Sequence, residues 1–322
     1  MLAIRPNEPG GPEVLQLREL PTPAPGGGQL LVRTEAIGVN YIDVYHRTGL
    51  YKLDSPLRLG QEGAGIVESV GSGVKEVKVG DRVAWCSGPG SYATHVILDE
   101  ARVVPVPAGI DPQLAGALLL QGLTAHYLAV DTFATSAEHT VLVHAAAGGV
   151  GLLLVQIARR RGARVLATVS TPEKAELARA AGAEHVILYT DQDFSTEVRK
   201  LTAGAGVHAV YDSVGKSTFE KSLRSLRPRG MMVLYGQSSG PVEKIDPQIL
   251  AANGSLFLTR PTLGHYTASR EELLSRAQDL LTWVQSGHLT VRIGATFPLS
   301  EARAAHEALE ARKTTGKVVL LP

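Results

Sequence analysis

The residues with the clearest chemistry form a run of small side chains, Ala145–Gly151, between two apolar segments. The segment before it, Thr140–Val143, is strand-like, and the segment after it, Leu152–Ala158, is typical of a buried helix. In this context the spacing Ala146-x-Gly148-x-x-Gly151 is typical of a turn that binds the pyrophosphate of a dinucleotide. Small residues let the backbone approach the phosphates, and the helix N-terminus supplies N–H donors and partial positive charge.

The end of the predicted second strand indicates which dinucleotide fits. A sheet that binds NAD carries an acidic residue there, about 20 residues past the glycines, which forms hydrogen bonds with the ribose hydroxyls. Here no carboxylate ends the strand, and Ser170, Thr171 and Lys174 offer hydroxyl, backbone and cationic donors. Such donors suit a 2′-phosphate at a helix N-terminus, so we predict NADPH. The plain alternative is that Lys174 is a solvated helix residue and Thr171 only a helix N-cap.

Composition narrows the classes of protein that this chain could be. Its 322 residues favour two domains, and a net charge of +1 gives no broad surface for nucleic acid or anionic membrane. It has no apolar run of about 18 residues and no signal-peptide pattern, so membrane insertion is not expected. The single cysteine, Cys86, excludes an intrachain disulfide, and a cytoplasmic location is the default expectation.

Up to about residue 110, short apolar runs alternate with turn clusters, a pattern typical of a small, mostly antiparallel barrel or sandwich. One short helix is predicted at Asn40–Thr48, ended by Gly49. The expected strands are Leu30–Ile37, Gly65–Val70, Arg82–Trp85, Tyr92–Leu98 and Val103–Val106.

From Asp111 the period changes, and a helix over Asp111–Asp131 opens a series of alternating strands and helices. The predicted strands are Val141–His144, Arg164–Val169, His185–Tyr189, His208–Asp212, Met231–Gly236 and Ser255–Thr259. The predicted helices between them are Val150–Arg161, Pro172–Ala181, Phe194–Thr202 and Thr218–Leu226. Six strands joined by helical crossovers predict an α/β fold with a doubly wound, six-stranded parallel sheet.

After Pro261 the pattern changes again, and we expect this tail to rejoin the N-terminal domain. It carries a predicted helix at about Ala268–Ser286, a strand near Phe297, a helix at Ser300–Arg312 and a strand at Lys317–Leu321. The predicted domains are therefore residues 1–122 with 262–322 for the substrate, and residues 123–261 for the dinucleotide.

The segment Gly60–Val67 resembles the Gly-His-Glu-x-x-Gly segment of zinc alcohol dehydrogenases, in the medium-chain dehydrogenase/reductase superfamily. Gln61 stands where those enzymes have a histidine ligand, Ala36 stands where they have a cysteine, and Cys86 has no partner cysteine. We therefore expect no metal. Eight histidines are expected at the edge of the core or on the surface: His95, His126, His144, His185, His208, His265, His288 and His306.

A closer resemblance covers nearly the whole chain in order. The segments Ala36–Asp43, Gly49–Tyr51, Gln121–Ala125, Ala145–Gly151, Tyr235–Gly240, Leu258–Pro261 and Arg312–Lys317 resemble NADPH:quinone oxidoreductases of the zeta-crystallin type. The resemblance implies a GroES-like β domain plus a Rossmann domain. It also implies zinc-independent hydride transfer from NADPH to a quinone in a cleft between the two domains. Relatives form a homodimer by pairing an edge strand, here the apolar segment near Ser255–Thr259.

The same resemblance implies a set of cofactor contacts. Those near the nicotinamide, its ribose and the carboxamide are Asn40, Tyr45, Thr124, Leu258 and Thr259. Those around the pyrophosphate are Ala147, Gly148, Gly149 and Val150. Those around the 2′-phosphate and adenosine are Ser170, Lys174 and Tyr189. The remaining groove residues are Val214, Tyr235, Gly236, Gln237 and Ser238, with Arg312 reaching the cofactor from the C-terminal tail.

Several of these residues have an ordinary structural explanation as well. Asn40 could cap the short helix, Thr124 could bond within its own helix, and Arg312 suits any helix C-terminus. Tyr45 and Tyr51 are the best candidates to face a substrate, because a phenol can donate to a quinone oxygen and cover an aromatic ring. We expect Tyr51 to hold the quinone without being an essential acid, and packing alone remains an alternative for Tyr45.

Two other functions stay open on the sequence. A reductase of activated alkenes, such as enals or enones, would present an electrophilic carbon to the same hydride. A non-catalytic NADPH-binding or RNA-binding protein is a second alternative, although no basic patch or aromatic platform favours RNA as the main partner.

Overall fold

The computed structural model describes residues 1–322, and these form two compact units. Unit 1 comprises Met1–Leu123 and Thr267–Pro322, and unit 2 comprises Thr124–Tyr266. The sequence put the second border at 261/262. Residues up to 266 stay with unit 2 because the Tyr266 ring stacks on Tyr127, with centroids 4.2 Å apart, and its hydroxyl accepts a hydrogen bond from Thr132 at 3.0 Å.

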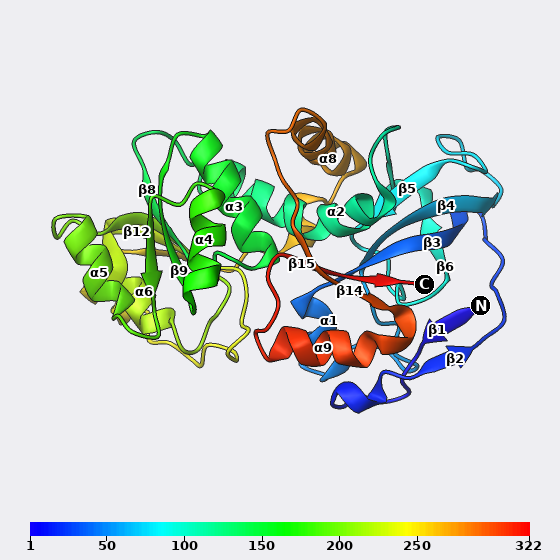
Figure 1. Cartoon of the computed structure of the whole chain (residues 1–322), viewed down its shortest axis with the longest axis horizontal. Helices are drawn as coiled ribbons and strands as arrows, with labels where there is room; N and C mark the ends of the chain where they lie inside the picture. Colours follow the sequence, from blue (N-terminus) through cyan, green and yellow to red (C-terminus); the bar gives the residue numbers. More distant parts are fainter. The chain divides into compact units, whose positions relative to one another are not determined.

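Unit 1 is built on a seven-stranded sheet with the order β14-β15-β3-β4-β5-β7, in which β6 also pairs with β3 (Figure 1). All of its pairings are antiparallel except that of β14 with β15. The strands are β3 (Gln29–Val39), β4 (Glu62–Val70), β5 (Arg82–Trp85), β6 (His95–Asp99), β7 (Val104–Pro105), β14 (Ile293–Pro298) and β15 (Lys317–Leu321). The mostly antiparallel sheet is confirmed, and the tail joins it through β15.

The helices of unit 1 pack around this sheet. They are α1 (Tyr41–Arg47), most of α2 (Pro112–Tyr127), α8 (Arg270–Gln285) and α9 (Ala302–Glu310). Short 3-10 turns lie at Pro12–Val14, Glu100–Arg102 and Leu299–Glu301. A two-stranded antiparallel ribbon, β1 (Leu2–Ile4) with β2 (Leu17–Glu19), was missed on the sequence, because each strand is three residues long and shows no clear alternation.

Unit 2 is a six-stranded, all-parallel sheet with the order β10-β9-β8-β11-β12-β13 (Figure 1). The strands are β8 (Thr140–Val143), β9 (Arg164–Val169), β10 (His185–Leu188), β11 (Val207–Asp212), β12 (Leu226–Leu234) and β13 (Phe257–Thr259). The helices are α3 (Gly149–Arg160), α4 (Pro172–Ala180), α5 (Phe194–Leu201), α6 (Phe219–Ser225) and α7 (Gln248–Ala252), with a 3-10 turn at Leu263–Tyr266. The strand order reverses between β8 and β11, where a doubly wound sheet binds ligands at its carboxyl edge.

Three expectations for unit 2 need correction. The fifth strand begins at Leu226 and not at Met231, because Leu226 already pairs with Val207 before the register shifts and pairing resumes at Met231. The sixth strand begins at Phe257 and not at Ser255, because Ser255 has a left-handed backbone with φ +55°. The helix expected to reach Asp131 is α-helical only to Tyr127 and continues as a π-helical turn over Leu128–Thr132.

The expectation for the histidines was wrong at three positions. His126, His144 and His306 are fully buried, whereas we placed them at the edge of the core or on the surface. Burial of a histidine is tolerable when hydrogen bonds satisfy its ring nitrogens, and both nitrogens of His144 and of His306 are bonded. Among the helices, none combines the length and the apolar character that crossing a membrane requires.

Candidate functional site

The predicted phosphate turn lies between β8 and α3 in unit 2. Ala145 has a left-handed backbone with φ +50°, and its carbonyl accepts a hydrogen bond from Gly148 N at 2.9 Å. A Cβ on Gly151 would come within 2.8 Å of Ala146 Cα, so glycine is required there for close packing of helix and turn. No side chain caps α3, and its first N–H groups have no partner within the helix. The turn Ala147–Val150 can therefore hold an anion with backbone donors.

Three predicted contacts lie at the carboxyl ends of β9 and β10. Lys174 Nζ donates to Ser170 Oγ at 3.4 Å, and Thr171 Oγ1 accepts from Lys174 N at 3.3 Å. Thr171 is thus an N-cap, as the plain alternative proposed, and the same turn brings the ammonium to the strand end. Tyr189 is 40% exposed, and its N–H donates to Val169 O at 3.1 Å. Donor groups and an aromatic ring gather where a 2′-phosphate and adenosine were predicted.

Asp212, at the end of β11, shapes the next loop. Its Oδ1 accepts from Val214 N at 2.7 Å and Gly215 N at 3.0 Å. Its Oδ2 accepts from Thr218 Oγ1 at 2.7 Å and Ser222 Oγ at 2.9 Å. The carboxylate is completely buried, so these four donors replace its hydration. The position of Val214 therefore depends on Asp212, which the sequence analysis did not select.

The adjoining loop after β12 carries Tyr235, Gly236, Gln237 and Ser238. Ser238 N donates to Ser213 O at 3.1 Å, and a Cβ on Gly236 would lie 2.8 Å from Ser213 Cα. Gly236 therefore does more than end a strand, because it lets the loops after β11 and β12 pack in direct contact. Leu258 and Thr259 lie in β13, paired with Met232 and Val233 of β12.

His144 connects three of these strand ends. Its Nδ1 lies 2.7 Å from Thr168 Oγ1 of β9, and its Nε2 lies 3.0 Å from Ser222 Oγ, which itself donates to Asp212. Burial lowers the pKa of His144, and the Asp212 carboxylate opposes that shift. His144 therefore links β9 to α6 through hydrogen bonds, directly before the predicted phosphate turn in the sequence. A histidine directly before a glycine-rich turn is the signal that could have identified it.

In unit 1, Asn40 stands at the start of α1 within a buried group of charges. Its Nδ2 donates to Glu62 Oε2 at 2.8 Å and to Gly38 O at 3.2 Å, and its Oδ1 accepts from Lys317 Nζ at 2.7 Å. Lys317 Nζ also forms an ion pair with Glu62, whose Oε1 accepts from Leu120 N at 2.8 Å. Both amide donors of Asn40 are thus used within the protein. Asn40 can meet a ligand only as an acceptor, for example from a ribose hydroxyl.

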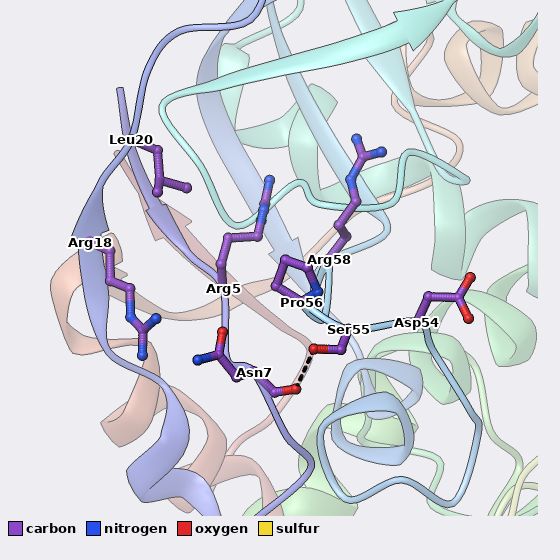
Figure 2. A pocket seen from close by; sticks show the side chains of 8 residues that line it. All are labelled: Arg5, Asn7, Arg18, Leu20, Asp54, Ser55, Pro56 and Arg58. Atoms are coloured by element: carbon purple, nitrogen blue, oxygen red, sulfur yellow. Dashed lines mark hydrogen bonds between the residues drawn. The ribbon is translucent and has the colours of Figure 1, made fainter.

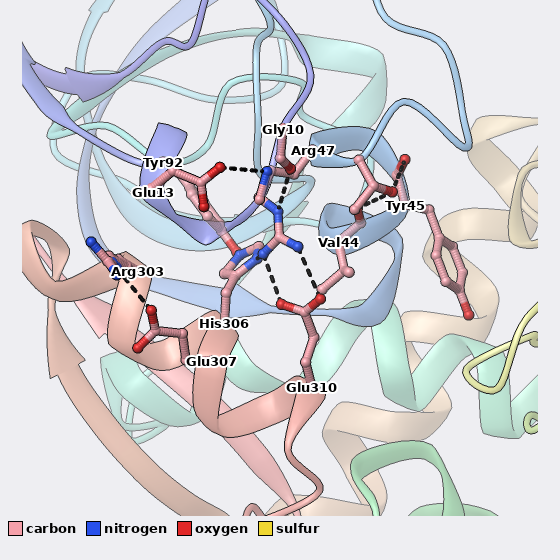
Figure 3. Close-up of polar contacts among 12 residues, drawn as sticks. Gly10, Glu13, Val44, Tyr45, Arg47, Tyr92, Arg303, His306, Glu307 and Glu310 are labelled. Carbon is pink, nitrogen blue, oxygen red and sulfur yellow. Dashed lines mark hydrogen bonds and ion pairs between the residues drawn. The ribbon is translucent and has the colours of Figure 1, made fainter.

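The buried charges continue from Asp43 to the protein surface. Asp43 Oδ2 accepts from Asn40 N at 2.8 Å and from Tyr92 OH at 3.2 Å, and Tyr92 OH lies 2.8 Å from His306 Nε2. Arg47 Nη1 lies 3.1 Å from His306 Nδ1 and pairs with Glu310 at 2.8 Å (Figure 3). None of these residues except Asn40 was selected on the sequence. Asp43, three positions after the N-cap Asn40, is the capping-box spacing that could have pointed to them.

Burial sets the ionisation of this group. It raises the pKa of Asp43 to about 7, although hydrogen bonds from Asn40 and Tyr92 and the charge of Lys317 act the other way. Burial, together with a smaller contribution from the charge of Arg47, lowers the pKa of His306 to about 3. Asp43 Oδ1 has no hydrogen-bond partner, whereas Oδ2 accepts the two hydrogen bonds from Asn40 and Tyr92.

The tyrosines expected near a substrate lie together in unit 1. The ring centroids of Tyr45 and Tyr51 are 5.2 Å apart with an edge-on arrangement, and Tyr51 N donates to Tyr45 O at 3.0 Å. Tyr45 is buried and Tyr51 half-buried, so both have a packing role. Thr124, which is the first residue of unit 2, is buried near the C-terminal end of α2.

Arg312 occupies a position that favours glycine. It follows α9 with φ +57°, and the paired bonds from Arg312 N to Leu309 O and Lys313 N to Ala308 O close the helix as a Schellman motif. A non-glycine residue in this conformation is strained by about 1 kcal/mol or more. Arg312 therefore has a structural role in ending α9, and its contact with a cofactor stays a prediction.

The residues present do not fit a catalytic zinc ion. No group of three or more His, Cys, Asp or Glu side chains is placed to hold a metal ion, and Gln61 and Ala36 occupy the positions that resemble ligand positions of zinc enzymes. Burial raises the pKa of Cys86 to about 12, so its thiol resists the deprotonation that metal binding needs.

Comparisons with known proteins agree with this two-part architecture. Residues 26–108 match the alcohol dehydrogenase GroES-like domain, and residues 149–280 match the zinc-binding dehydrogenase family. The fold and the glycine turn thus define a medium-chain dehydrogenase/reductase.

Individual relatives narrow the family. A quinone oxidoreductase of Pseudomonas aeruginosa is 47% identical over 97% of both chains, and a 2-haloacrylate reductase of a Burkholderia species is 45% identical over 97% of this chain and 96% of its own. The structure of Escherichia coli quinone oxidoreductase complexed with NADPH superimposes with a TM-score of 0.98, at 42% identity over 100% of both chains. The chain belongs to the quinone oxidoreductase family.

Proposed function

We propose that this protein is an NADPH-dependent reductase of quinones that works without zinc. The observation that carries the proposal is the likeness, over the full chain, to a quinone oxidoreductase whose structure was solved with NADPH. The donor groups at Ala147–Val150, Ser170 and Lys174 support it, because they match a pyrophosphate and a 2′-phosphate at the carboxyl edge of a parallel sheet. When bound, NADPH would supply a hydride to the acceptor.

The remaining chemistry requires little catalytic help from the side chains. Reduction of a quinone gives an aromatic ring, and the phenol oxygens formed have pKa values of about 10, so water or one weak donor can protonate them. In this proposal Tyr51 holds the quinone, and Asn40 accepts a hydrogen bond with an orientation fixed by Glu62 and Lys317. The meeting of the two sets of residues in one cleft stays a prediction, as does the cytoplasmic location.

An assay of NADPH oxidation tests the proposal. We expect turnover that depends on added benzoquinone or naphthoquinone, with NADPH strongly preferred over NADH, and no loss of activity after dialysis against a chelator. Oxidation of NADPH that no quinone accelerates would contradict the proposal. A stoichiometric metal ion that turnover requires would contradict its zinc-free part.

A reductase of activated alkenes is the second candidate. The 45% identity to a 2-haloacrylate reductase favours it, because a haloacrylate presents an electrophilic carbon–carbon double bond. An enone and 2-chloroacrylate in the same assay separate the two candidates. A higher kcat/KM on these alkenes than on both quinones would make the alkene the substrate class.

We also propose a homodimer formed through the edge of the parallel sheet. β13 has no neighbour on one side, and Phe257 within it is 58% exposed. An apolar edge strand of this kind needs a partner to cover it. Light scattering at micromolar concentration should give twice the chain mass of 34.1 kDa, and a monomer would contradict the proposal.

A further inference from the structure

A pocket of about 390 Å³ opens in unit 1, and none of its lining residues belongs to the site described above (Figure 2). Three arginines, Arg5, Arg18 and Arg58, line it together with the apolar side chains of Leu20 and Pro56. Since the comparisons and the proposed reaction give this pocket no role, its concentration of positive charge needs a separate explanation.

The ribbon of β1 and β2 forms one wall of the pocket. Ala3 lies directly opposite Arg18 in this antiparallel pair, and opposite residues project from the same face. Arg5 directly follows β1, and Leu20 directly follows β2. The ribbon thus brings two cations and one apolar side chain to the lining of the pocket.

A second wall is the loop that carries Pro56 and Arg58. Leu57 N donates to Pro6 O at 2.8 Å, and Ser55 Oγ donates to Asn7 O at 2.8 Å, which fixes this loop against the segment after β1 (Figure 2). Gly90, with φ +94°, closes the space behind it. A Cβ on Gly90 would lie 2.7 Å from Arg5 Nη2 and 3.2 Å from Arg58 Nε, so both guanidinium groups converge on this residue.

Arg5 is a buried cation without an anionic partner. Its side chain belongs to a residue only 9% exposed, and it donates only to Ile4 O at 3.1 Å and Gly90 O at 3.0 Å. A guanidinium has five N–H donors, so three of them lack an acceptor within the protein. Burial and the nearby Arg58 lower the pKa of Arg5 to about 10, which leaves it charged at neutral pH. A buried charge in this state is costly unless an anion pairs with it.

We propose that this pocket binds a small molecule that carries a phosphate group. Arg5 and Arg58 would hold the phosphate oxygens through the paired N–H geometry that suits this anion, and Arg18 would add a third positive charge. Leu20 and Pro56 would contact an apolar part of the molecule. The exposed Asp54 carboxylate lines the pocket without an ion pair to any of the three arginines, so it disfavours a second anionic group on the ligand.

Calorimetric titration at fixed ionic strength tests the site with three probes: phenyl phosphate, inorganic phosphate and phenol. We expect one phenyl phosphate per chain and no measurable binding of phenol. Arg58→Gln and Arg18→Gln should each weaken phenyl phosphate about tenfold, the effect of losing one charge-assisted contact. Arg303→Gln, an exposed arginine of the same unit that pairs with Glu307, is the matched control and should bind like the wild type.

Each outcome either tests the proposal or identifies the source of the phosphate. Equal affinity for phenyl phosphate and inorganic phosphate would identify free phosphate as the ligand, and tighter binding of phenyl phosphate would identify an organic phosphate. Binding of phenol as tight as that of phenyl phosphate, no saturable binding of either phosphate, or unchanged affinity in Arg58→Gln would overturn the proposal. Loss of binding in Lys174→Glu would place the phosphate at the proposed cofactor site instead. Because Arg18 and Arg58 are exposed, their variants should fold even if Arg5→Gln does not.

Discussion

Each of the two units stabilises a buried carboxylate, and the two do so in different ways. In unit 1, Glu62 is fully buried and pairs with the equally buried cation Lys317. In unit 2, Asp212 is also fully buried, yet its oxygens accept hydrogen bonds from two backbone N–H groups and two hydroxyls. The first arrangement joins α1, β4 and β15 through charge, whereas the second shapes a loop through dipoles.

Because of this difference, substitutions in the two units should have different consequences. An ion pair in a low-dielectric interior loses its compensation when one partner is removed, and the remaining charge is strongly destabilising. The Asp212 carboxylate also fixes the loop that carries Val214. Changes to the buried ion pair of unit 1 should therefore act on the free energy of unfolding, and changes to the donor side chains at the strand ends of unit 2 should act on ligand affinity.

The largest expected effect is that of Glu62→Gln. It leaves the Lys317 ammonium buried without its carboxylate, and we expect the free energy of unfolding to fall by roughly 3–5 kcal/mol. Urea denaturation measures this change. The control in unit 2 is Glu184→Gln, which removes the exposed ion pair with Arg164 and should cost less than about 1 kcal/mol.

A double variant sharpens the same test. Glu62→Gln with Lys317→Met removes both charges, so it should lose less stability than Glu62→Gln alone. Equal losses in the single and double variants would show that the charge of Lys317 is not what destabilises Glu62→Gln.

The pH dependence of stability should show two opposite contributions in unit 1. Asp43 has a pKa of about 7 in the folded protein against 3.8 ordinarily, so its stabilising protonation is lost as the pH rises towards 7. His306 has a pKa of about 3 against 6.5 ordinarily, so its contribution is present above 6.5 and is lost as the pH falls towards 3. Between pH 3.8 and 6.5 the two slopes cancel.

Single variants should expose each slope. Relative to the wild type, Asp43→Asn should make stability rise with pH in this window, and His306→Gln should make it fall, by up to about 1.4 kcal/mol per pH unit in each case. Urea denaturation at a series of pH values measures both. Parallel profiles for the two variants and the wild type would contradict the assigned ionisation.

In unit 2, Lys174→Glu should change affinity and leave stability almost unaltered. If the proposed 2′-phosphate contact is right, the lost cation and the added repulsion should weaken NADPH roughly 100-fold. NADH lacks that phosphate, so the affinity for NADH should change less than about threefold. Fluorescence titration measures both, and Lys200→Glu, an exposed lysine on α5, is the matched charge reversal. An equal loss for the two dinucleotides would remove the phosphate role.

Much of the fold could be predicted because it depends on local patterns. β9 and β15 match the predicted Arg164–Val169 and Lys317–Leu321 residue for residue, since apolar runs bounded by turn residues define them. The strand–turn–helix form of the predicted phosphate turn could be predicted in the same way, because Gly151 is constrained by neighbours close in sequence.

The buried charges of unit 1 could not be predicted in this way. Lys317 and Asn40 are in contact although 277 positions separate them, and Arg47 and His306 are 259 positions apart. A lysine after a glycine and a histidine within a helix give no local sign that tertiary packing will bury them. The sequence therefore located the residues proposed to contact ligand, but missed those that orient them.

The smallest expected effect is that of Tyr51→Phe, which removes one hydroxyl and keeps the ring that packs on Tyr45. A single hydrogen bond contributes about 0.5–1.5 kcal/mol, so kcat/KM for a quinone should fall by roughly tenfold or less. Because the hydroxyl is proposed to hold the substrate, the change should appear mainly in KM, with kcat almost unaltered. A fall of several orders of magnitude in kcat on every quinone would instead make Tyr51 an essential proton donor, and unit 1 would then supply chemistry as well as orientation.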